Sequence, residues 1–132
     1  MHRETYVFER GNWLVKGDKV TPGVPASLNP FPEKAPRNRL GLAQWLTAKE
    51  NPLTARTITN RIWEQLFGVG IAETLEDLGS QGIAPTHPEL LDWLSFHFME
   101  DDQWSIKKLI RKIVMSGVYQ QDSKVSEEML EK

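Results

Sequence analysis

Apolar residues recur three and four positions apart in four segments of the chain, which is the spacing of one face of an α-helix. The clearest of these segments lies within residues 51–70. Asn51 and Pro52 are typical of a helix start, and Gly68 is typical of the left-handed residue that ends a helix. The apolar face of this central helix consists of Ala55, Ile58, Ile62 and Leu66.

Three further helices follow from the same pattern. One is expected at residues 39–49 behind the cap Asn38, and another runs to Met99 from the capping box Thr86-His-Pro-Glu89. The last is expected at residues 106–116, with an apolar seam turned inward. We therefore predict an all-α fold with about four main helices. The seam of the last helix consists of Ile106, Leu109, Ile110, Ile113 and Val114.

Two segments lack the helical period. Residues 1–37 hold five of the eight prolines, which favours an extended proline-rich N-terminal arm packed on the body. Within it we expect two short extended pieces, Thr5–Phe8 and Trp13–Val15, around a turn at Arg10–Asn12. Glycines punctuate residues 68–85, which predicts a glycine-rich connection. We accordingly divide the chain into the arm, a helical domain at 38–122, and a charged helical tail at 123–132 that leads to a truncated continuation.

Composition excludes several classes of function. The chain has 132 residues, no cysteine and a net charge of −2. Without cysteine it has no disulfide, thiolate nucleophile, cysteine-ligated zinc or covalent c-type haem attachment. The small net charge predicts no nucleic-acid partner, and no apolar run is long enough for membrane insertion. We expect no cofactor in this domain.

Two groups of titratable residues are candidates for catalysis or metal binding. Glu73, Glu76 and Asp77 could supply the paired carboxylates of glycoside hydrolysis, but acidic residues are common on exposed turns. We favour a role for Asp77 in accepting hydrogen bonds from backbone donors of the connection. His87 and His97 lie ten residues apart on one helix, point in different directions and cannot chelate one metal together. We expect His97 to pair one turn on with the carboxylate of residue 101.

The basic side chains of the last helix and four of the tryptophans could form binding surfaces. The last helix carries a basic face that could meet phosphate or an acidic partner, although we favour a solvated face. Four tryptophans could line a sugar or a partner surface, although in a small helical body we expect them in the core. The basic face consists of Lys107, Lys108, Arg111 and Lys112, and the tryptophans are Trp45, Trp63, Trp93 and Trp104.

Six polar residues gather at the glycine-rich connection and the helix ends beside it, and they form the candidate polar cluster. If they converge on an open, tryptophan-lined cleft, they indicate a carbohydrate site. If they are buried and bonded to one another and to backbone, they are internal bracing of the domain. The cluster consists of Arg56, Asn60, Asp77, His87, Glu89 and Asp92.

Several runs of residues, covering nearly the whole chain, carry a family resemblance. The most specific is Pro85-Thr-His-Pro-Glu-Leu-Leu-Asp-Trp93. Together the runs resemble the C-terminal domain of unknown function of planctomycete-type exported proteins, which is usually found with planctomycete cytochrome c domains. Leu78 departs from the aromatic residue usual in that family. The other runs are Arg10-Gly11, Pro22-Gly-Val-Pro25, Arg39-Leu-Gly-Leu-Ala-Gln-Trp-Leu46, Asn51-Pro-Leu-Thr-Ala-Arg56, Asn60-Arg-Ile-Trp63, Leu66-Phe-Gly68, Glu76-Asp-Leu-Gly79, Trp104-Ser105, and Ser116 with Tyr119.

The resemblance implies a multidomain parent protein in an extracytoplasmic setting, in the periplasm or at the cell surface. It supplies no catalytic residues to carry over. Because no catalytic or metal-binding set is complete, we predict a non-catalytic interaction or structural module that docks against other domains of its parent, a cytochrome c domain among them. The alternative is a carbohydrate-binding or carbohydrate-acting domain, with glycan as its partner.

Overall fold

The computed structural model describes residues 4–122, which contain four α-helices and one two-stranded sheet. Contacts divide the chain into two compact units after Asn51. We call them unit 1, up to Asn51, and unit 2, from Pro52 onward. The predicted domain boundary between residues 37 and 38 is not tested by this division and stays a prediction. The predicted tail at 123–132 lies outside the described residues.

The predicted all-α class is wrong, because unit 1 contains an antiparallel β-hairpin. Strands β1 (Thr5–Phe8) and β2 (Lys16–Val20) pair with Thr5 opposite Val20. A short 3-10 turn, Glu9–Gly11, lies between them. All five residues of β2 are exposed. Because no face of this strand is buried, its sequence lacks the apolar alternation from which a strand is predicted.

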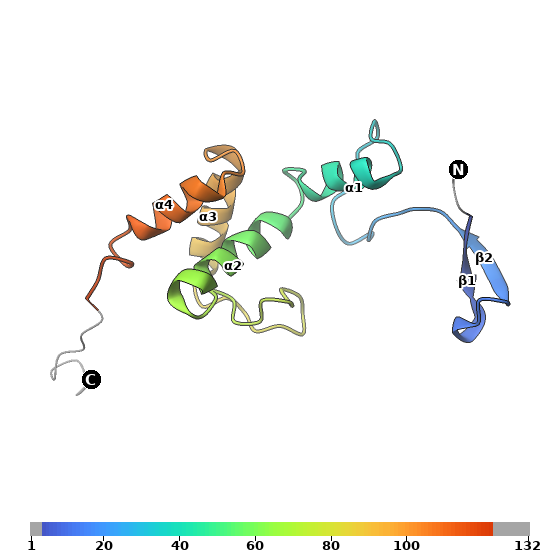
Figure 1. Cartoon of the computed structure of the whole chain (residues 1–132), viewed down its shortest axis with the longest axis horizontal. Helices are drawn as coiled ribbons and strands as arrows, with labels where there is room; N and C mark the ends of the chain where they lie inside the picture. Colours follow the sequence, from blue (N-terminus) through green and yellow to red (C-terminus); the bar gives the residue numbers. More distant parts are fainter. Residues whose placement is uncertain (1–3, 123–132) are drawn as a thin grey trace. The chain divides into compact units, whose positions relative to one another are not determined.

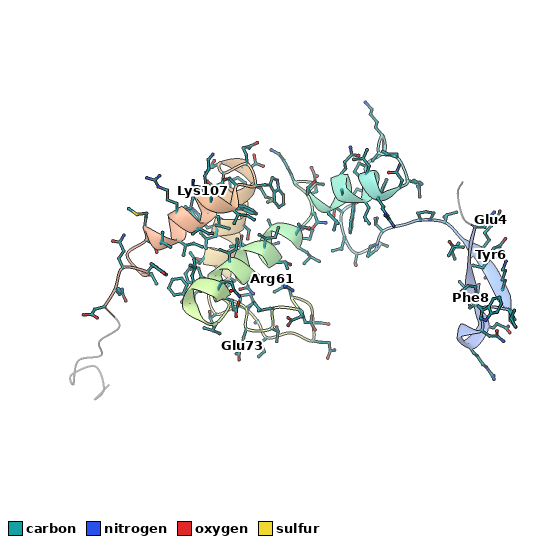
Figure 2. The ribbon with its side chains drawn as sticks, in the orientation of Figure 1. Glu4, Tyr6, Phe8, Arg61, Glu73 and Lys107 are labelled. Atoms are coloured by element: carbon teal, nitrogen blue, oxygen red, sulfur yellow. The ribbon has the colours of Figure 1, made fainter. Side chains whose placement is uncertain are left out.

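Polar contacts at the open end of the hairpin reinforce the strand pairing. The carboxylate of Glu4 accepts hydrogen bonds from Lys19 Nζ and from the hydroxyl of Tyr6. The bond from Lys19, followed by the bond from Tyr6, lowers the pKa of Glu4 below its usual value. Figure 2 shows Glu4, Tyr6 and Phe8 along this strand and the segment that leads into it.

The proline-rich segment of unit 1 packs on helix α1 (Arg39–Leu46). The indole Nε1 of Trp45 donates to the carbonyl oxygen of Asn29 at 2.7 Å, and both residues are buried. At Gly41 an added Cβ would lie 1.9 Å from the carbonyl oxygen of Pro36, so only glycine allows this approach. Asn38 is the N-cap, as predicted: its Oδ1 accepts from the amides of residues 40 and 41.

Unit 2 contains the helices α2 (Thr54–Phe67), α3 (Pro88–Glu100) and α4 (Ile106–Val114), drawn in Figure 1. Helix α2 begins two residues after Pro52 and ends at Gly68, which has the predicted left-handed conformation with φ of 83°. No helix among residues 4–122 is long and apolar enough to cross a bilayer. The buried core of the unit consists of Ala55, Ile71, Leu91, Leu94, Phe98, Leu109 and Ile113.

The predicted inward seam of α4 is only partly covered. Leu109 and Ile113 are buried, whereas Ile106 is 52% exposed and Ile110 is also exposed. The apolar stripe of α4 is therefore wider than the surface of α2 and α3 that it packs against.

Trp45→Phe removes the indole N–H and leaves the buried Asn29 carbonyl without this donor. We expect a loss of about 1–2 kcal/mol in the local stability of unit 1. Hydrogen exchange of the α1 amides measures this change. Trp13→Phe is the matched control, because Trp13 is 70% exposed and should leave exchange unchanged. Equal protection of α1 in wild type and Trp45→Phe would contradict the assigned role of the bond.

Candidate functional site

The glycine-rich connection between α2 and α3 is held to α2 by the side chain of Asn60. Asn60 is 1% exposed. Its Nδ2 donates to the carbonyl oxygen of Ala72 at 2.7 Å, and its Oδ1 accepts from the Ala72 amide at 3.0 Å. A Cβ on Gly70 would lie 2.5 Å from the same carbonyl oxygen. The amide side chain thus replaces a pair of backbone partners and fixes where the connection leaves the helix.

Thr74 and Asp77 organise the middle of the connection. The hydroxyl of Thr74 donates to the Asp77 carbonyl oxygen at 2.8 Å and accepts from the Ile83 amide at 3.0 Å. The carboxylate Oδ1 of Asp77 accepts from the Gly79 amide at 2.8 Å. Asp77 therefore has the backbone-bonding role that the sequence favoured. A Cβ on Gly82 would lie 2.0 Å from the Asp77 carbonyl oxygen, so only glycine allows the loop to close at this point.

The far end of the connection is tied back by Thr86. Its amide and its hydroxyl both donate to the Ile71 carbonyl oxygen, at 2.8 and 3.1 Å. The predicted capping box is therefore wrong, because the hydroxyl that would cap α3 is used for this tertiary contact. His87 occupies the N-cap position without a side-chain cap bond, and its Nδ1 lies 3.0 Å from Thr86 Oγ1. Glu89 is exposed in the first turn of α3.

Arg56 and Asp92 link the starts of α2 and α3. Arg56 Nε lies 2.6 Å from Asp92 Oδ1, and its Nη1 donates to the Pro52 carbonyl oxygen at 2.6 Å. This pair lines an open cleft of about 560 Å³ between the helix starts and the connection. Apolar residues form most of the remaining lining, and tryptophan is absent from it. These apolar lining residues are Leu53, Leu78, Ile83, Ala84, Pro85, Pro88 and Leu91.

The six members of the candidate polar cluster therefore do not converge on one point. Arg56 and Asp92 meet at the cleft, whereas Asn60 is buried beneath the connection and Asp77 bonds its backbone. The remaining two members, His87 and Glu89, are exposed at the start of α3. Four of the six side chains thus form hydrogen bonds or an ion pair within the fold, and Asn60 is the buried one among them.

The histidines and carboxylates form no metal centre in the part of the chain that the structure describes, where three or more such groups nowhere converge. His97 Nδ1 donates to the Trp93 carbonyl oxygen at 2.8 Å. Its Nε2 lies 3.6 Å from the carboxylate of Asp101, which confirms the predicted pairing one turn on. The carboxylates of the connection remain separate from this pair.

An exposed aromatic surface on α3 was missed by the sequence reasoning. Trp93 was expected in the core, yet it is 49% exposed, and Phe96 is 57% exposed. The ring centroids of Trp93 and His97 lie 4.0 Å apart. The Phe96 ring packs edge-on against His97, with 5.5 Å between the centroids. We call Trp93, Phe96 and His97 the aromatic surface. Helical position could have revealed it, because residues 93 and 96 lie off the stripe formed by Leu91 and Leu94.

Asn60→Ala deletes both bonds to Ala72 and leaves a buried N–H and C=O without partners. We expect a loss of about 2–4 kcal/mol in the free energy of unfolding, measured by chemical denaturation. Gln65→Ala on the same helix is the control. Gln65 is exposed, and its replacement should change stability by less than about 0.5 kcal/mol. Similar small losses in both variants would rule out the structural role of Asn60.

Comparison with known proteins identifies the family and no closer relative. No curated protein and no solved structure matches the chain. The family described as PSD1, protein of unknown function (DUF1553), matches residues 38–132. This match begins at the N-cap of α1, includes all four helices and covers most of the chain. The chain therefore belongs to the PSD1 (DUF1553) family of proteins of unknown function.

Proposed function

We propose that this protein is a non-catalytic docking module of a larger exported multidomain protein, and that it docks through the aromatic surface of α3. The observation that carries the proposal is the position of Trp93 and Phe96 on the solvent side of a helix whose other side forms the core. Folding of unit 2 does not require large aromatic residues there. Exposed aromatic side chains that are grouped together are typical of protein interaction sites.

The aromatic surface is held in place before any partner arrives. Lys112 Nζ lies 5.6 Å from the centre of the Trp93 ring and donates to Asp102 Oδ2 at 2.8 Å. Asp102 is itself buried. The indole is therefore fixed by His97 from its own helix and by Lys112 from α4. A side chain that is already ordered loses less conformational entropy on binding, which favours affinity.

The proposed partners are other domains of the parent protein. The family resemblance suggests a cytochrome c domain as one such partner, and it suggests an extracytoplasmic location. A partner that covers Trp93 and Phe96 would place Lys112 and the pair His97–Asp101 at the edge of the interface. The partner surface should therefore present an apolar pocket with both polar donors and acceptors at its rim.

A carbohydrate role is the second candidate, and the cleft beside Arg56 and Asp92 is the observation in its favour. Sugar rings commonly stack on aromatic side chains, but the aromatic residues of unit 2 lie outside this cleft. The Arg56 guanidinium is also engaged by Asp92 and by the Pro52 carbonyl oxygen. The docking function therefore accounts for more of the geometry.

Trp93→Ala and Phe96→Ala should each weaken binding to the separately expressed remainder of the parent by roughly tenfold or more, because exposed aromatic anchors dominate interface energies. Isothermal titration calorimetry with the 132-residue chain measures this loss. Both variants should keep the fold, measured by circular dichroism, since neither side chain belongs to the buried core of unit 2.

Trp13→Ala serves as the matched control, because Trp13 is an exposed tryptophan of unit 1 and should leave the affinity unchanged. Absence of heat with wild type at high concentration would overturn the docking proposal. A glycan screen would then follow. Glycan binding that is lost in Arg56→Ala and retained in Trp93→Ala would establish the alternative.

A further inference from the structure

Unit 1 contains a small apolar pocket that the docking function leaves unused. Its volume is about 250 Å³. The extended segment Pro22–Val24 forms one wall, and the side chains of Phe31 and Leu42 contribute the apolar lining opposite. This volume is below the roughly 300–1,000 Å³ of pockets for drug-sized molecules, and it suits a single apolar side chain.

Two arginines and no acidic residue line the pocket. Arg37 is structural: its Nη1 donates to the Pro22 carbonyl oxygen at 2.9 Å, and its guanidinium lies 5.9 Å from the centre of the Phe31 ring. Arg39 is exposed, and its side chain forms no hydrogen bond or ion pair with another residue of the described range 4–122. A positive charge thus stands beside the apolar pocket without a counter-charge.

The extended wall offers room and backbone groups to a ligand. A Cβ built on Gly23 meets nothing within 4 Å, so this part of the wall is bare main chain. Within the described residues, the amides of Gly23 and Val24 donate no backbone hydrogen bond. An extended peptide that lies along such a segment can use these amides, as peptides do when they add to a strand.

We propose that this pocket binds the C-terminal residue of an extended peptide. The apolar side chain of that residue, leucine or phenylalanine, enters between Phe31 and Leu42, and its terminal carboxylate pairs with Arg39. The apolar lining supplies the affinity for the side chain, and the charge-assisted bond selects a free carboxylate. Asn38 contributes no side-chain acceptor to this recognition, because its Oδ1 already caps α1.

Fluorescence anisotropy with labelled five-residue peptides tests the assignment on the full chain. A peptide that ends in a free leucine carboxylate should bind about tenfold more tightly than the same peptide ending in a carboxamide. Arg39→Gln should remove this preference and leave binding of the carboxamide unchanged. Lys34→Gln is the control, because it removes an exposed cation of unit 1 that does not line the pocket.

Gly23→Leu provides an independent variant that adds a side chain to the wall of the pocket without disturbing the packing around it. The added side chain enters open space, so circular dichroism should match that of the wild type while both peptides lose measurable binding. Equal affinity of wild type for carboxylate and carboxamide peptides, or unchanged binding by Gly23→Leu, would overturn the proposal. Hydrocinnamate binding as tightly as the peptide would overturn the choice of a peptide, because a free acid makes no use of the extended wall.

Discussion

The two hydrogen bonds between Asn60 and Ala72 are the contact on which the arrangement of unit 2 depends. They join α2 to the glycine-rich connection, which has no helix or strand and therefore no regular backbone hydrogen bonds of its own. From this point the connection continues to Thr86, which bonds back to Ile71, the neighbour of Ala72. These bonds fix the connection next to the start of α3, where the Arg56–Asp92 pair also joins the two helices. Burial of Leu91, Leu94 and Phe98 on one side of α3 leaves the aromatic surface on the other side.

In unit 2 the polar side chains are mostly hydrogen-bonded within the fold, whereas several large apolar side chains are exposed. The polar groups that drew attention in the sequence are largely satisfied within the fold, with Asn60 bonded to backbone and Arg56 to Asp92. Large apolar side chains that the fold leaves exposed include Trp93 and Phe96.

Local signals in the sequence predicted the helices well, and tertiary contacts account for the errors. The Asn38 cap and the Gly68 end depend on short-range geometry, and both were predicted correctly. The capping box at Thr86 failed because its hydroxyl bonds to Ile71, fifteen residues away. Thr5–Phe8 was predicted as an extended piece and forms β1, whereas β2 was missed because all five of its residues are exposed. Trp93 was expected in the core of a small helical body, but its position on α3 lies off the buried stripe.

Hydroxyl-radical footprinting of the 132-residue chain, alone and with the remainder of its parent, tests the docking account most directly, because it reports side-chain exposure residue by residue. The account predicts that oxidation of Trp93 and Phe96 falls several-fold in the complex while oxidation of Trp13 stays constant. A complex in which Trp93 and Phe96 are oxidised as fast as in the free chain would contradict it.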